Sequence, residues 1–111
     1  MPSIKIETSA NITAQDQEKL ALEISSACAA WLNKPEKVIQ VRIASGMTIS
    51  FGGTVCKDSA FVVIALIGSI AAETKAVLPE RFAAILGKYG ISANRIFLRY
   101  MESEASAWGW N

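Results

Sequence analysis

The sequence consists of two similar halves, and this internal repeat restricts the possible folds more than any other feature. Five apolar residues at helical spacing in the first half are matched by five more about 58 positions later. The two sets are Leu20, Ile24, Ala27, Cys28 and Trp31, and Leu78, Phe82, Ile85, Leu86 and Tyr89. After each helix pattern comes a stretch with alternating apolar side chains, and these stretches match at an offset of about 57. Each half therefore predicts a strand, a helix and a second strand.

In the first half, alternation predicts a strand over residues 3–8. A helix is expected to begin after the N-cap residue Thr13 and to end near Asn33, because the proline two positions later disfavours further helix. A strand over residues 38–43 should follow. Residues 46–57 contain three glycines, which indicates a loop with a turn and room for one short strand.

In the second half, residues 60–66 are apolar without interruption, the pattern of a strand buried on both faces. The following helix pattern contains Pro79, so this helix is expected to kink there or to begin its regular part close to it. Gly87 and Gly90 lie at its end. A last strand is expected over residues 95–100, with alternate side chains on opposite faces.

Two strand–helix–strand units predict an α+β fold. Each unit is expected to be a right-handed βαβ crossover with parallel strands. Together they give a four-stranded mixed sheet with two helices on one face, in one domain (1–111) with a pseudo-repeat of 1–57 and 58–111. Two helices leave the other face of the sheet bare, and 51% of the chain is apolar. Oligomerisation through the bare face is the simplest way to cover it.

The composition argues against several classes of function. A net charge of +1 without a basic cluster disfavours binding of nucleic acid. The longest apolar run is far shorter than the roughly 20 residues that span a bilayer, and we expect no secretory signal. Two isolated cysteines and no histidine offer neither a disulfide scaffold nor a metal site, so we expect a reducing cytoplasm with Cys28 as a core residue. No cofactor-binding motif is present.

Short motifs along the whole chain, in the right order and spacing, resemble one known family. They are Met1-Pro2 before the first strand, Asn33-Lys34-Pro35-Glu36, Phe51-Gly52-Gly53, Ile67-Gly68, Asn94-Arg95-Ile96 and Trp108-Gly109-Trp110-Asn111. On these motifs the chain resembles the macrophage migration inhibitory factor branch of the tautomerase superfamily. The resemblance implies a homotrimer whose sheets form a central barrel, with active sites between subunits and no cofactor.

The resemblance also assigns roles to individual residues. The amino-terminal proline of the family is the base in keto–enol tautomerisation and matches Pro2, once Met1 has been removed. Lys34 matches the lysine at the mouth of the pocket, and Ile67 matches the isoleucine whose backbone lies close to the substrate. Two positions depart from the family: Phe97 replaces a tyrosine contributed by a neighbouring subunit, and Arg99 replaces an asparagine on the same strand face.

The residues suit such chemistry. An α-amino group has a pKa of about 8, and strand alternation places Pro2 on the apolar face. Burial there, beside Phe97, Trp108 and Ile67, would disfavour the ammonium form and lower the pKa, so that the amine is neutral at working pH. The substrate expected from the resemblance is a small α-keto acid of the phenylpyruvate type.

Other interpretations stay open at this stage. Arg99 could bind a substrate carboxylate or pair with Glu102, and Trp108 and Trp110 could be subunit-packing anchors rather than substrate contacts. Phe97 could serve only in packing. The protein could therefore be an interaction or signalling protein that keeps the trimer with weak catalysis, or an unrelated ferredoxin-like binding domain.

Overall fold

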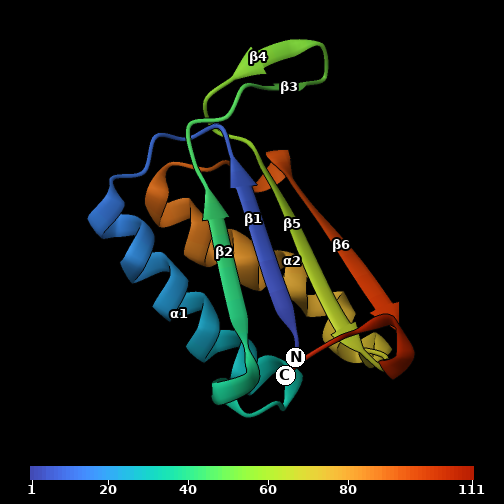
Figure 1. Ribbon diagram of the computed structural model, residues 1–111. Helices are drawn as coiled ribbons and strands as arrows, with labels where there is room; N and C mark the ends of the chain where they lie inside the picture. The colour runs from blue at the N-terminus through green and yellow to red at the C-terminus, as the bar shows by residue number, and fades with distance from the viewer.

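The computed structural model describes residues 1–111 and contains a four-stranded sheet in the order β2-β1-β5-β6 (Figure 1). The strands are β1 (Ser3–Thr8), β2 (Gln40–Ala44), β5 (Ala60–Ile67) and β6 (Ile96–Ser103). The pairs β1–β2 and β5–β6 are parallel, and the central pair β1–β5 is antiparallel. The mixed sheet expected from the repeat is thus confirmed.

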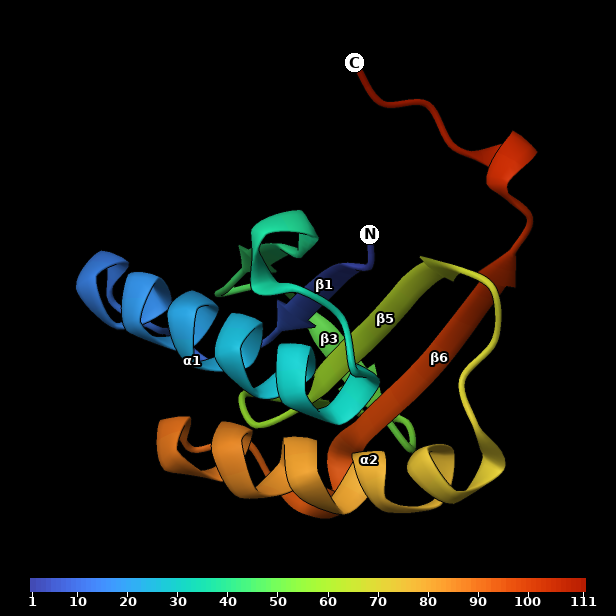
Figure 2. The same cartoon turned by 90° about the horizontal axis from the view of Figure 1, so that it is seen from below.

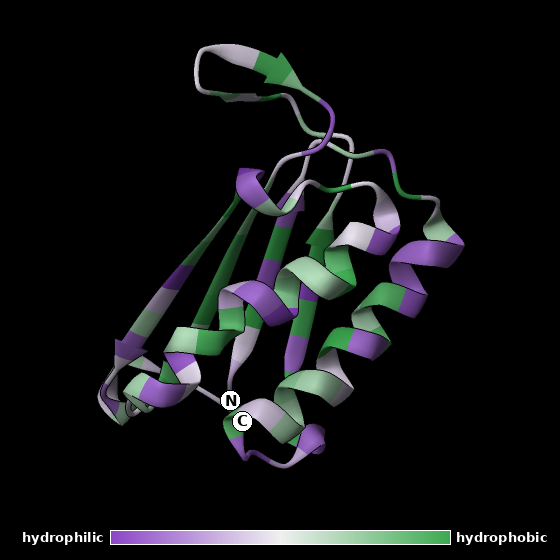
Figure 3. Ribbon diagram, turned by 180° about the vertical axis from the view of Figure 1, so that it is seen from behind, coloured by the Kyte–Doolittle hydropathy of each residue, from purple (hydrophilic) through white to green (hydrophobic).

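Both helices lie on the same side of this sheet, as Figure 2 shows from below. They are α1 (Ala14–Leu32) and α2 (Ala72–Leu86). Each carries hydrophobic and hydrophilic segments in turn (Figure 3), which is typical of helices with one buried face. The buried positions match in the two halves: Leu20, Ile24 and Cys28 in α1, and Leu78, Phe82 and Leu86 in α2.

Helix α1 begins and ends where its sequence signals indicate. The hydroxyl of Thr13 accepts a hydrogen bond of 3.2 Å from the backbone N–H of Asp16, which satisfies one free donor of the first turn. Asn33 ends the helix in the left-handed conformation, with a φ of 53°. Cys28 is fully buried in this helix, and desolvation raises the pKa of its thiol to about 12.

Helix α2 continues through its proline. Pro79 has no N–H, so the carbonyl of Lys75, four residues earlier, loses its helical partner. The hydroxyl of Tyr100 on β6 donates a hydrogen bond of 3.2 Å to that carbonyl. Of the two alternatives expected at Pro79, a helix whose regular part begins there was wrong, because α2 begins at Ala72. The edge strand supplies a donor in place of the one that proline lacks.

Strand boundaries, and one pair of short strands, also differ from the predictions. Strand β2 starts at Gln40 rather than at residue 38, because Glu36–Val38 forms a 3-10 turn, η1. Strand β6 extends to Ser103. Residues 46–57 hold two short strands, β3 (Ile49–Phe51) and β4 (Thr54–Cys56), which form a hairpin that projects beyond the end of the sheet (Figure 1).

The sheet face away from the helices is uncovered within one chain. Along β5 the side chains that face the helices are buried, whereas Phe61 is 38% exposed and the other outward residues are half-buried. On β6, Phe97 is 63% exposed and Met101 is 46% exposed. The prediction that residues 60–66 are buried on both faces thus does not hold within a single chain, because both helices pack on one side.

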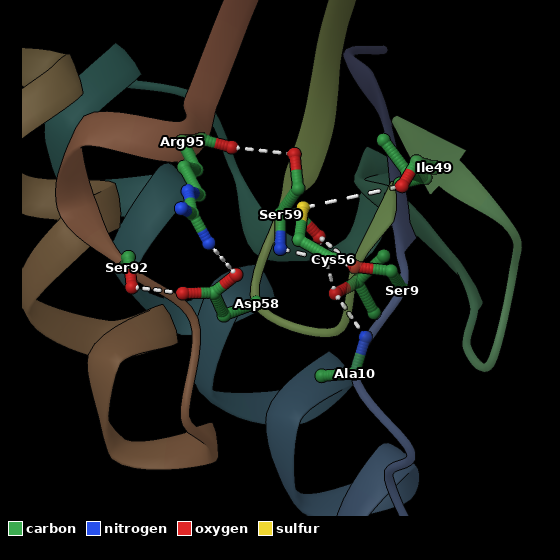
Figure 4. A network of polar contacts seen from close by, with 9 residues as sticks. Ser9, Ala10, Ile49, Cys56, Asp58, Ser59, Ser92 and Arg95 are labelled. Atoms are coloured by element: carbon green, nitrogen blue, oxygen red, sulfur yellow. Dashed lines mark hydrogen bonds and ion pairs between the residues drawn. The ribbon is translucent and has the colours of Figure 1, made fainter. Parts of the chain in front are cut away.

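A polar network ties the hairpin end of the sheet to the end of α2 (Figure 4). Asp58 accepts hydrogen bonds from the Ser92 hydroxyl and from the Arg95 guanidinium. These two contacts lower the pKa of the Asp58 carboxyl, and the hydrogen bond from Ser92 has the larger effect. The Ser59 hydroxyl donates to the Arg95 carbonyl at 2.8 Å, so the start of β5 and the start of β6 are held together.

Candidate active site

Pro2 immediately precedes β1 and is almost completely inaccessible to solvent. Its carbonyl accepts a hydrogen bond of 3.1 Å from the backbone N–H of Gln40, the first residue of β2. The next residue, Ser3, donates a side-chain hydrogen bond of 2.8 Å to the Gln40 Oε1 atom. Two strands therefore fix the position of Pro2, although it lies one residue from the chain terminus.

A cavity of about 320 Å³ lies beside Pro2. Three segments line it: the start of the chain, the turn η1 with the residues that follow it, and the C-terminal segment. The lining residues are Met1, Pro2, Ser3, Lys37, Val38, Ile39, Gln40, Trp108, Gly109 and Trp110. Lys37 has the only ionisable side chain among them. The cavity thus combines a buried proline, two indole rings and one cation.

Trp108 is held in place by hydrogen bonds to the end of β6. Its indole N–H donates to the Ser103 hydroxyl at 2.8 Å, and that hydroxyl donates to the carbonyl of Leu66 at 3.1 Å. The carbonyl of Ser103 accepts a hydrogen bond of 2.9 Å from the N–H of Gly68. Ser103 therefore contacts the residues on both sides of Ile67 in sequence, as well as the indole at the cavity.

The segment after Ile67 is held by the carboxylate of Glu102. Glu102 accepts a hydrogen bond of 2.7 Å from the N–H of Ile70 and one of 2.8 Å from the Lys75 ammonium. Both contacts lower the pKa of the Glu102 carboxyl, and the hydrogen bond from Lys75 has the larger effect. Arg99 and Glu102 lie on opposite faces of β6, so the pairing of Arg99 with Glu102 considered from the sequence does not form, and Arg99 has no ion pair within the chain.

Lys34 does not line the cavity at Pro2. It borders a separate hollow of about 270 Å³ between the end of α1 and the start of α2, together with Trp31, Leu66 and Ser69. Its backbone N–H donates to the carbonyl of Ala29 at 3.1 Å and continues the helix end. Ile67 ends β5 on the strand next to Pro2 but lines none of the three hollows.

Phe97 lies far from Pro2 within one chain, and Arg99 does not line the cavity at Pro2. Phe97 pairs with Phe61 of β5, and Phe61 pairs with Glu7 of β1. Phe97 is therefore two strands away from β1 and five residues along from Pro2, a separation of roughly 19 Å. Its ring contacts that of Phe51 in the hairpin, with ring centroids 5.2 Å apart. Arg99 borders a third hollow, which it shares with Trp108. Among the residues predicted for the site, only Trp108 lies with Pro2 in the cavity beside it.

Sequence reasoning missed three residues that the structure places at or behind this cavity: Lys37, Gln40 and Ser103. Gln40 could have been recognised as a candidate, because it is a polar residue at the start of the strand that pairs with β1. The other two depend on the turn η1 and on the path of the C-terminal segment, for which the sequence gives no periodic signal.

Other kinds of site find no support in the structure. No group of three or more His, Cys, Asp or Glu side chains is placed to hold a metal ion. Neither helix combines the length and apolar character required to cross a membrane. Pro2 is buried at the wall of a cavity with two indole rings, and this cavity is the strongest candidate for an active site.

Comparison with known proteins agrees with this fold over the whole chain. The family model of the macrophage migration inhibitory factor matches residues 1–111. A macrophage migration inhibitory factor homolog of Trichuris trichiura is 28% identical over 87 residues, which cover 78% of this chain and 76% of that protein.

Two solved structures are similar throughout. The macrophage migration inhibitory factor homologue of Prochlorococcus marinus has a TM-score of 0.88 and 29% identity, covering 98% of this chain and 95% of that one. The macrophage migration inhibitory factor-like protein of Entamoeba histolytica has a TM-score of 0.90 and 26% identity, covering 99% and 95%. The chain belongs to the macrophage migration inhibitory factor family of the tautomerase superfamily.

Proposed function

We propose that the protein is a keto–enol tautomerase that acts on small α-keto acids of the phenylpyruvate type, with Pro2 as the general base. The observation that carries the proposal is the burial of Pro2 at the wall of a cavity with two indole rings. Removal of Met1 would leave a secondary amine at that point. A buried, neutral amine of this kind can accept a proton at neutral pH.

In the proposed reaction the Pro2 nitrogen and the substrate exchange a single proton. The amine takes the proton from the enol oxygen or from the carbon beside the keto group, and the resulting ammonium returns it to the other atom. No net oxidation occurs and no further reactant is consumed. A developing enolate oxygen would be stabilised by donors at the cavity, as in other enolisations.

We further propose that the working form is a homotrimer with sites between subunits. Phe97 lies too far from Pro2 to reach it within one chain, Arg99 does not line the cavity at Pro2, and both are on the uncovered sheet face. A neighbouring copy could bring them to the cavity while covering that face. The family resemblance is the ground for including Ile67 and Lys34 in the proposed site. Action in the cytoplasm is part of the proposal, because both cysteines are free thiols.

The replacement Pro2→Gly tests the base directly. It keeps a free amino terminus but removes the secondary amine, so ketonisation of enol phenylpyruvate should slow by roughly 10²-fold or more. Intact-mass spectrometry must show that Met1 is removed in both proteins, because its retention blocks the amine. A matched control is Leu22→Ala on the exposed side of α1. An unchanged rate in the glycine variant would refute the proposed base.

A second candidate function is an interaction or signalling protein that keeps the trimer with little catalysis. The observation that favours it is Phe97, which lacks the phenolic hydroxyl of many relatives. Phe97→Tyr restores that hydroxyl and should raise the tautomerase rate if catalysis is the function. A trimeric protein by light scattering that is inert both before and after this change would favour the second candidate.

A further inference from the structure

Glu102 lies near the end of β6, and neither the family resemblance nor the proposed reaction gives it a role. We propose that Glu102 is a positioning residue of the site at Pro2: its carboxylate fixes the segment 68–71, and through that segment it holds the Trp108 indole at the wall of the cavity. The inference rests on the proposed function for the chemistry at Pro2, but the order of the segment and the binding of a ligand can be measured without turnover.

The segment 68–71 joins β5 to α2 and is supported by β6. The N–H of Ile70 donates a hydrogen bond of 2.7 Å to the Glu102 Oε2 atom, and the N–H of Gly68 donates one of 2.9 Å to the carbonyl of Ser103. Gly68 has a φ of 90°, in the left-handed region, so the chain turns directly after β5. Two adjacent residues of one strand therefore hold two residues of this turn.

The carboxylate has a structural reason, because the start of α2 has no cap of its own. The N-cap residue Ala71 has no side chain that accepts a hydrogen bond, and Ile70 before it is only 8% exposed. A backbone N–H that is shielded from water needs a partner, and Glu102 supplies it. The negative charge also suits the N-terminal end of a helix. Lys75 donates to the other carboxylate oxygen at 2.8 Å, so Glu102 is held from two directions.

The segment is connected to the cavity through Ser103. Adjacent side chains of a strand point to opposite faces, so Glu102 reaches the start of α2 while Ser103 reaches the C-terminal segment. The Ser103 hydroxyl accepts the hydrogen bond of the Trp108 indole, and its carbonyl accepts that of Gly68. Movement of the segment would break the contact at Gly68 and free Ser103 to shift together with the indole. Because Trp108 lines the cavity beside Pro2, loss of the Glu102 carboxylate should loosen a wall that the ligand contacts.

The test separates the hydrogen bond to Ile70 from the ion pair with Lys75. Glu102→Ala removes both contacts. Glu102→Gln keeps an oxygen that can accept the N–H but loses the charge, and Lys75→Met keeps the carboxylate but loses the ammonium. The matched control is Glu104→Ala, because Glu104 is exposed and its side chain has neither a capping hydrogen bond nor an ion pair.

Two readouts at pH 7 need no turnover. Hydrogen exchange at the Ile70 amide and at the Trp108 indole N–H is compared by NMR with exchange at the amides of β1, and 3-phenylpropanoate is titrated as a non-reacting ligand. Glu102→Ala should speed exchange at both sites roughly tenfold relative to β1 and weaken binding roughly threefold to tenfold. Glu102→Gln, Lys75→Met and Glu104→Ala should stay within about twofold of the unaltered protein, because a partly exposed ion pair contributes little.

Four results would overturn the positioning role. They are equal acceleration at β1 and at the two sites in Glu102→Ala, unchanged binding in that variant, a loss in Glu102→Gln as large as in Glu102→Ala, and an unaltered protein that does not bind the probe. Should Glu102→Ala fail to fold, Glu102→Asp takes its place with the same expected results. Its carboxylate is one carbon shorter and cannot keep the same hydrogen bond to Ile70.

Binding and turnover can fail separately, so the two proposals are distinguishable. Exchange and binding that depend on Glu102 in a protein without tautomerase activity would support this inference and refute the proposed function. If the protein is active, Glu102→Ala should raise KM for the keto acid roughly threefold to tenfold with little change in kcat, because the indole contacts the ligand before and during the reaction. Glu102→Gln should restore KM, and an unchanged KM in Glu102→Ala would overturn the inference.

Discussion

The indole N–H of Trp108 donates a hydrogen bond of 2.8 Å to the hydroxyl of Ser103. The same hydroxyl donates to the carbonyl of Leu66, so one small side chain links the C-terminal segment to the end of β5. The C-terminal segment borders the cavity at Pro2, and the proposed site includes Ile67 at the end of β5. Ser103 touches no proposed reacting atom, which makes it a positioning residue: it holds the wall formed by Trp108 at a fixed distance from the strand that carries Ile67.

Removal of the Ser103 hydroxyl should loosen that wall. Ser103→Ala is expected to cost about 1 kcal/mol in the free energy of unfolding and to speed hydrogen exchange at the Trp108 indole N–H, measured by NMR. In the proposed reaction it should lower kcat/KM several-fold. Ser103→Thr keeps a hydroxyl and should restore slow exchange and most of the rate. Equal exchange in the alanine and threonine variants would contradict the positioning role.

The contact between Tyr100 and α2 predicts a specific double-mutant result. In the unaltered chain Tyr100→Phe should cost about 1 kcal/mol, because the carbonyl of Lys75 loses the hydroxyl donor. In a Pro79→Ala background the restored amide N–H can bond that carbonyl, so the same change should cost much less. The coupling should be roughly 0.5–1 kcal/mol in urea unfolding. Equal costs in the two backgrounds would show that the hydroxyl does not replace the missing helical bond.

The network of Figure 4 predicts how stability depends on pH. Hydrogen bonds from Ser92 and Arg95 lower the pKa of Asp58 in the folded state. Its contribution to stability is therefore complete above the ordinary carboxyl pKa of about 4 and is lost as the pH falls through the lower, folded-state value.

Asp58→Asn should accordingly flatten the acid side of the stability profile, measured as urea midpoints from pH 7 to pH 2.5. The exposed residue Glu18, which has no ion pair, provides the control: Glu18→Gln should leave the profile unchanged. A profile as steep in Asp58→Asn as in the unaltered protein would exclude Asp58 as a source of the acid sensitivity.

Strong local signals in the sequence predicted the main elements. The Thr13 cap and the end of α1 at Asn33 were found from residue type alone, because capping depends on neighbouring backbone groups. Of the hairpin of β3 and β4, the turn and one short strand were predicted, but the pairing of two strands was not, since three-residue strands are too short to show a period. Its two central glycines, Gly52 and Gly53, both have positive φ and make the tight turn that joins the strands.

The sequence by itself determined the two strand–helix–strand units and the placement of Pro2 on the buried side of β1, because both follow from the period of the side chains along the backbone. Only the tertiary structure decided which lysine borders the cavity at Pro2. Lys34 and Lys37 are three residues apart in the same polar segment, and the turn η1 and the pairing of β2 with β1 send them to different hollows. Which residues meet in one cavity depends on strand register and on the path of the chain, which local residue patterns do not encode.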